Sequence, residues 1–245
     1  MVDYTREEHG LSIRKACDAI RISRSVYYYQ PDASKDDAVI AEVQTVVERY
    51  PAYGFSKVFT KVRRAGNPWN HKRVYRVYCA LNLNLRRKGK KRLPSRNPEP
   101  LTVPADMNQC WSIDFMSDSL FCGRRFRTFN VVDDYNREAL AIEVDRSLPS
   151  VRVLERIVAW GGYPVKIRMA NGPEFISVTL ADWADKNDIQ LEFIKPGKPT
   201  QNSYVERFNR TYRTEVLNMY AFRRLSEVRE ITDNWVMEYN EERPH

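Results

Sequence analysis

Apolar residues in the first third of the chain recur at the spacing of amphipathic helices. Within residues 4–30, apolar residues recur at helical spacing at Leu11, Ile13, Ala16, Cys17 and Ile20. A break at residues 21–22 precedes a second predicted helix over 24–29, with Ser23 as its N-cap. Two short helices joined by a short turn are typical of a helix-turn-helix, although a plain helical hairpin fits the same pattern. Both interpretations stay open on this pattern alone.

The next stretch is also predicted to be helical. Valines at positions 39, 43, 46 and 47 form one apolar stripe, and two more helices are expected over 55–65 and 71–81, separated by a Gly-Asn-Pro break at 66–68. The helix at 71–81 combines a basic face with an apolar face that could pack against its neighbours. Residues 35–85 are therefore expected to form a second helical region.

The periodicity changes after residue 109. Strands are expected at 110–116, 125–132, 139–144, 165–169 and 190–194, and helices at 151–160, 179–186, 204–217 and 225–239. Three consecutive strands followed by alternating helices and strands predict an α/β fold, with a mixed sheet covered by helices.

A basic, proline-containing segment separates these regions. Arg86, Arg87, Lys88, Lys90, Lys91 and Arg92 lie within seven positions, and four prolines follow between 94 and 104. No core could accept so many unpaired charges, so the run is expected to be exposed, either tracking a DNA backbone or as a solvated linker. The expected divisions are 1–34, 35–85, 86–106 and 107–245.

Charge adds to this organisation. The 245-residue chain has a net charge of +8, but residues 1–100 carry 21 Lys and Arg against 10 Asp and Glu, whereas residues 101–245 carry 19 against 22. A basic front half is typical of nucleic-acid binding, because neutralising phosphates releases counterions; a solvated basic surface is the alternative.

Other function classes find little support. No apolar run approaches the ~18 residues of a membrane span and no signal-peptide pattern opens the chain, so a cytoplasmic location without membrane association is expected. Four cysteines lack Cys-x-x-Cys spacing and only three histidines are present, which argues for reduced thiols and against a zinc site.

Two carboxylates attract attention as candidate chemistry. Asp114 interrupts an otherwise apolar strand, where a charge is costly unless it is paired or bound to a metal. Glu206 shares a helical face with Arg210 and Arg213. The structural alternatives are an outward-facing residue for Asp114 and a surface ion pair for Glu206.

At these residues the chain resembles the integrase-type transposases of bacterial insertion sequences, which are relatives of retroviral integrases. More narrowly, it resembles the second-frame protein of the large two-frame insertion-sequence family. The motifs that carry the resemblance lie at 53–55, 72–75, 86–92, 111–115, 131–137, 171–175, 199–209 and 239–245. Their order along nearly the whole chain makes the resemblance specific.

The resemblance implies a ribonuclease H-like core and an Asp, Asp, Glu triad with 35 residues between the second Asp and the Glu. Carried over, Asp114 is the first Asp and Glu206 is the Glu, while the second Asp position holds Ala170. The family chemistry uses two Mg²⁺ ions, which require hard oxygen ligands. Neither Glu174 nor Asn171 obviously replaces the missing ligand, so we expect this chain to be inactive or severely impaired.

The implied activity is strand cleavage and strand transfer on double-stranded DNA, at the element's terminal repeats and at target DNA. The resemblance also implies at least a dimer on DNA, a first-frame partner protein, a nucleoid location when bound, and a short tail beyond His245. The alternatives are a non-catalytic DNA-binding protein, either a decayed copy or a competitor at element ends, and a ribonuclease H-like nuclease without transposition.

Besides the basic run, the residues expected to contact DNA are Arg24, Lys72, Arg73, Arg76, Lys195, Lys198, Gln201, Asn202 and Arg210. For the loop that carries Lys195 and Lys198, plain solvation is the alternative.

Overall fold

The computed structural model divides the chain into two compact units, residues 1–85 and 86–245. It describes residues 1–30, 33–84, 101, 103–172, 175, 177–195 and 199–243. Each unit has apolar clusters of its own. No helix within these described ranges combines the length and apolar character needed to cross a membrane.

Residues 1–30 form three short helices, α1 (Val2–His9), α2 (Ile13–Ile20) and α3 (Arg24–Tyr27). Ser12 and Ser23 cap α2 and α3, and Arg21 ends α2 in the left-handed conformation with φ 59°. The prediction of two helices was therefore incomplete: α1 precedes them, because Gly10 in the left-handed region separates a further helix at the very start.

The second helical region contains η1 (Ala33–Asp36), α4 (Asp37–Arg49), α5 (Phe55–Arg64) and α6 (His71–Ala80). These bounds agree with the helices predicted from the apolar spacing. Val39, Val43 and Val46 of α4 are buried, as the stripe predicts, and they form one cluster with buried residues of α5 and α6. Asn70 caps α6 by accepting a hydrogen bond from the Lys72 amide.

The second unit is built on a five-stranded mixed sheet. Its strands are β1 (Cys110–Ser119), β2 (Arg125–Asp133), β3 (Ala139–Asp145), β4 (Lys166–Met169) and β5 (Gln190–Phe193), in the order β3-β2-β1-β4-β5. β1, β2 and β3 are antiparallel neighbours, whereas β4 and β5 run parallel to β1. β1 is longer than predicted because its hairpin with β2 continues through Ser119 to the turn around Gly123, where φ is +80°.

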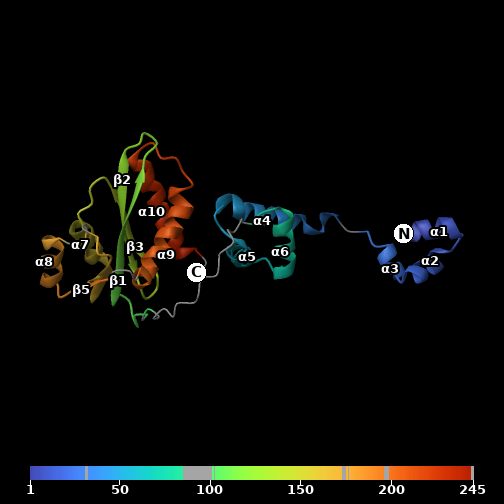
Figure 1. Cartoon of the computed structure of the whole chain (residues 1–245), viewed down its shortest axis with the longest axis horizontal. Helices are drawn as coiled ribbons and strands as arrows, with labels where there is room; N and C mark the ends of the chain where they lie inside the picture. The colour runs from blue at the N-terminus through green and yellow to red at the C-terminus, as the bar shows by residue number, and fades with distance from the viewer. Residues whose placement is uncertain are drawn as a thin grey trace. The chain divides into compact units, whose positions relative to one another are not determined.

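Helices cover both faces of this sheet, as Figure 1 shows. α7 (Ser150–Gly161) and α8 (Val178–Lys186) pack on one face, against a cluster that includes Trp111 and Ile113. α9 (Ser203–Tyr212) and α10 (Leu225–Glu241) pack on the other, with Met116 and Phe126. The order βββ-α-β-α-β-α-α and this layering confirm the predicted ribonuclease H-like fold.

Two details of the covering helices depart from simple expectation. α9 was predicted to run to residue 217, but its regular part ends at Tyr212. A short 3₁₀ helix, η2 (Pro199–Asn202), precedes α9, and a π-helical turn, η3 (Arg213–Leu217), follows it. α10 lies along the outer strand β3: the Asn240 side chain accepts from the Ala139 amide at 2.9 Å and donates to its carbonyl at 3.1 Å, and Arg229 donates to the Val144 carbonyl at 2.9 Å.

Candidate active site

Asp114 lies at the centre of the sheet, on the middle strand β1 and opposite Asn130 of β2. It is half-buried, and its Oδ1 accepts from the Phe115 amide at 2.9 Å. Its Oδ2 accepts from Nδ2 of Asn209, on α9, at 2.7 Å. The carboxylate is therefore turned toward α9 and held there, not left outward on a free face.

A second hydrogen bond extends this contact into the core. Asn209 Oδ1 accepts from Asn130 Nδ2 at 2.6 Å, and both asparagines are buried. Because Asn209 uses its acceptor on Asn130, its NH₂ group is the part that faces Asp114. The three side chains form a polar chain across β2, α9 and β1.

Ala170 directly follows β4, the parallel neighbour of β1. Ser112 pairs with Arg168 at the end of that ladder, and Ala170 lies two residues beyond Arg168, as Asp114 lies two residues beyond Ser112. Ala170 is half-buried and packs against the apolar cluster under α7 and α8. The position expected to supply the second carboxylate of the triad thus carries a methyl group.

Glu206 lies on α9 one turn before Asn209, so the two share a helical face. It is exposed, and across the described residues its side chain forms no hydrogen bond or ion pair. The suggested surface pairing with Arg213 is not formed, because Arg213 binds Asp118 Oδ2 at 3.1 Å. Asn209 thus links Asp114 to the helical face that carries Glu206.

This set of donors does not fit a pair of Mg²⁺ ions. Of the three positions expected to ligate metal, two hold carboxylates, and Ala170 offers no side-chain oxygen. The neighbouring Asn171 carries a neutral amide, whose Nδ2 donates to the Ile194 carbonyl at 2.5 Å. No cluster of three or more His, Cys, Asp or Glu suited to a metal occurs among the residues described, and Glu174 lies outside them.

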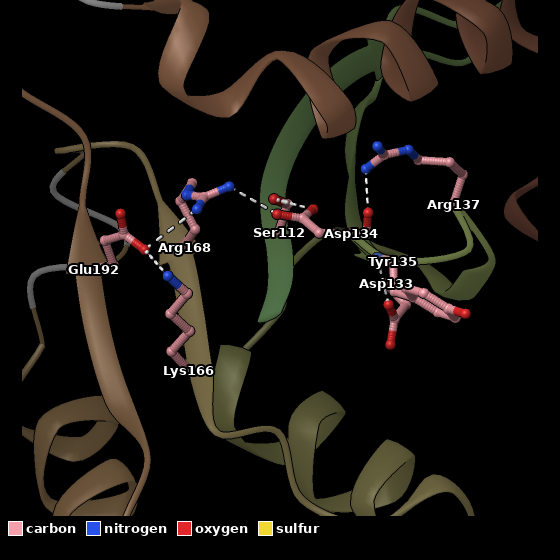
Figure 2. Close-up of polar contacts among 8 residues, drawn as sticks. All are labelled: Ser112, Asp133, Asp134, Tyr135, Arg137, Lys166, Arg168 and Glu192. Atoms are coloured by element: carbon pink, nitrogen blue, oxygen red, sulfur yellow. Dashed lines mark hydrogen bonds and ion pairs between the residues drawn. The ribbon is translucent and has the colours of Figure 1, made fainter. Parts of the chain in front are cut away.

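A buried charged network is built around Ser112, which lies two residues before Asp114 on β1; Figure 2 shows its contacts. Asp134, which is fully buried, accepts from the Ser112 hydroxyl at 2.6 Å and from Arg168 Nη1 at 2.7 Å. Arg168 also reaches Glu192 Oε2 at 3.4 Å, and Lys166 lies 3.0 Å from the same oxygen. The network ties β1, β4 and β5 to the turn after β2.

Burial dominates the electrostatics of this network. It raises the pKa of Asp134 above its usual range, although the hydrogen bond from Ser112 and the charge of Arg168 oppose the shift. Burial, reinforced by the neighbouring Asp134 charge, raises the pKa of the Cys110 thiol to about 12. Cys110 is therefore a neutral thiol, which makes it a poor nucleophile.

The neighbouring Asp133 has a structural role, since its carboxylate accepts from the amides of Asn108 and Tyr135, each at 2.8 Å. Arg137 donates to the Asp134 carbonyl and stacks over the ring of Tyr204 on α9, 3.2 Å from the ring centroid. The turn after β2 therefore contacts and supports the first part of α9, the helix that carries Glu206.

The residues predicted to contact DNA lie in varied settings. Arg24, Lys72, Lys195 and Arg210 are exposed. Arg73 and Arg76 instead clamp Asp36, at 2.8 and 2.5 Å, and the hydrogen bond from Arg73 leads the causes that lower the pKa of Asp36. These two arginines therefore hold η1 on α6.

The remaining predicted contacts divide between buried and undescribed positions. Asn202 is buried, with 3% of its surface exposed, and Gln201 Oε1 accepts from the Lys195 amide at 2.8 Å. The predicted contacts that lie outside the described residues are Arg86, Arg87, Lys88, Lys90, Lys91, Arg92 and Lys198.

Sequence reasoning missed Asn130 and Asn209. The available signal was Asn130 itself, a polar residue directly between Phe129 and Val131 in a predicted core strand. A buried amide requires a partner, but its identity depends on the packing of α9.

The chain is similar to known proteins along most of its length. Models of the integrase core domain match residues 104–199 and 187–245, and a model of an HTH-like domain matches residues 34–91. The 31.7 kDa protein of insertion element IS407 from Burkholderia multivorans is 39% identical over 98% of this chain and 88% of its own length.

Two further similarities are more distant. The putative transposase InsK of insertion sequence element IS150 from Escherichia coli K12 is 23% identical over 92% of this chain and 86% of its own length. A structure of the HTLV-2 integrase catalytic core domain in complex with magnesium is 16% identical, with a TM-score of 0.40 over 56% of this chain and 88% of that one. From the extent of the IS407 match and the integrase-core models, the chain belongs to the insertion-sequence transposases with an integrase core.

Proposed function

We propose that this chain binds the terminal repeats of an insertion sequence as double-stranded DNA, and that its own catalytic step is disabled at Ala170. The observation that carries the proposal is the position of Asp114. Asn209 on α9, one helical turn after Glu206, holds its carboxylate, and Ala170 directly follows β4, the parallel neighbour of β1. Two of three carboxylate positions are filled, and the third is occupied by a methyl group.

With a third carboxylate, divalent ions bound here would supply activation of the attacking oxygen and stabilisation of the leaving one. The chain's own residues orient that site: Asn209 fixes the Asp114 carboxylate, and the Arg137–Tyr204 stack supports the start of α9. The reaction proposed for the restored chain is strand cleavage and strand transfer into target DNA, by at least a dimer on DNA, with a first-frame partner.

The test is the substitution Ala170→Asp, assayed for cleavage and joining of duplexes that carry the element's terminal repeats. We expect Mg²⁺-dependent strand transfer from Ala170→Asp and none from the present chain with Mg²⁺ or Mn²⁺. A second readout needs no activity. The new carboxylate beside Asp114 should lower the thermal stability without metal, because like charges repel, and Mg²⁺ should restore it.

Ala170→Asn is the matched control, since it adds a similar volume without the charge. Activity in the present chain would overturn the assignment of Ala170 as the defect. The alternative of a purely DNA-binding protein would gain support if Ala170→Asp bound terminal repeats, and bound Mg²⁺, but joined no strands.

A further inference from the structure

Three arginines converge on a hollow at the end of the β1–β2 hairpin. Arg125 and Arg127 lie on β2, Arg146 directly follows β3, and all three line a surface hollow of about 510 Å³ with Ser117 and Ser119 of β1. The strand register pairs Ser117 with Arg127 and Ser119 with Arg125, so these four side chains leave the same face of the hairpin. The hollow thus gathers guanidinium and hydroxyl donors.

The carboxylates nearest to this arginine hollow are already neutralised by other residues. Asp118 pairs with Arg213 at 3.1 Å, and Asp145 pairs with Arg229 at 2.9 Å. The side chain of Arg125 is exposed and forms no ion pair with any part of the chain that the structure describes; the same holds for Arg146. Positive charge therefore accumulates here, within a half of the chain whose net charge is negative.

One arginine of the hollow is held in place by aromatic packing. The Arg127 guanidinium lies 4.8 Å from the ring centroid of Phe115, and that ring packs 4.7 Å from Phe129. A guanidinium stacked on a buried aromatic group loses less conformational entropy when it binds a ligand. The hollow is thus partly ordered before any ligand arrives.

The arginine hollow opens on a different face of the sheet from the candidate active site. Alternation along β1 places Ser117 and Ser119 on the side of Phe115, which packs with the α7 and α8 cluster, whereas Asp114 faces α9. A ligand bound at the hollow therefore contacts protein surface that the Asp114 site does not use.

We propose that the arginine hollow binds phosphates of a duplex DNA backbone, as a contact separate from the Asp114 site and from the helical unit. Guanidinium groups match phosphate oxygens in paired hydrogen bonds, and serine hydroxyls add single donors. The charges line an open surface hollow beside a strand end and do not surround an enclosed cavity. This geometry favours duplex DNA over a small anion as the ligand. The inference rests on the proposed action on DNA.

The test compares the full chain with the double variant Arg125→Gln/Arg146→Gln, using a fluorescent random-sequence duplex over a range of salt concentrations. Each lost phosphate contact should lower the slope of log K against log salt by about 0.9. We expect the slope to fall by about 1 to 2 and the affinity at low salt to fall about tenfold. Duplex binding should also protect the amides of the β1–β2 hairpin from hydrogen exchange in the parent chain only.

Arg152→Gln/Lys186→Gln is the matched control, because it removes two exposed cations from α7 and α8. An equal loss of slope in both double variants would mean that the effect comes from net charge alone, and it would overturn the proposal. So would an unchanged slope, or protection by inorganic phosphate without protection by the duplex. If the parent chain failed to bind any duplex, the proposed function itself would fall.

Discussion

At the scale of single residues, the orientation of Asp114 depends on an amide that carries no charge. Asn209 donates to Asp114 and accepts from Asn130, so its own orientation is fixed from both ends. Motifs located Asp114, Ala170 and Glu206 in the sequence, and Asn209 lies within the same motif as Glu206. Its role was not predictable, because its partners lie 95 and 79 residues away.

Replacing this amide should loosen the site. In the Ala170→Asp background, Asn209→Ala should weaken Mg²⁺ binding about 10- to 100-fold, because Asp114 loses the donor that orients it. It should also cost about 1–3 kcal/mol of unfolding free energy, because Asn130 is left buried without its acceptor. Thermal unfolding at a series of Mg²⁺ concentrations measures both effects.

Asn187→Ala provides the control for that experiment. It removes a comparable hydrogen bond, 2.7 Å to the Trp183 carbonyl, at the end of α8. Equal losses of Mg²⁺ affinity in the two variants would contradict the positioning role of Asn209.

At the scale of elements, periodicity predicted the strands and helices because each buries one face. The strand bounds differ from the prediction by at most three residues, and those of α5 and α6 by one. The π-helical turn after α9 was not predictable, since apolar spacing does not distinguish its hydrogen bonds from those of an α-helix. Likewise, the basic face of α6 gave no sign that Asp36 would occupy Arg73 and Arg76.

The junction of β4 with the turn after β2 depends on the buried Arg168–Asp134 pair. Arg168→Met should lower the free energy of unfolding by about 3–5 kcal/mol at pH 7, because Asp134 stays buried after losing its cationic partner. Denaturant unfolding measures this loss. Lys166→Met, which breaks only a partly exposed pair with Glu192, should cost less than about 1 kcal/mol.

The same variant predicts a pH dependence of definite sign. Burial already raises the pKa of Asp134, and loss of Arg168 should raise it further. The native state then binds more protons than the unfolded state above the ordinary Asp pKa, so its stability falls as pH rises. Arg168→Met should therefore be less costly at pH 5 than at pH 7. A pH-independent cost would contradict this account.

At the scale of the molecule, each of the two units has its own apolar clusters. Leu154 is a fully buried residue of α7. Leu154→Ala should lower the free energy of unfolding of the second unit by about 2–5 kcal/mol. Hydrogen exchange should show faster opening of β1–β5 and unchanged protection of α4–α6. Val43→Ala in α4 should give the reverse pattern, and coupled losses in both units would refute independent folding.

The contacts of α10 with β3 have a consequence for association between chains. An outer strand normally presents unpaired amides and carbonyls that can template a strand from another molecule. Here Asn240 occupies both backbone groups of Ala139, and Arg229 occupies the Val144 carbonyl. Helix side chains thus mimic the missing strand at both ends of β3, which leaves that edge poorly suited to amyloid-like growth or to domain swapping by strand exchange.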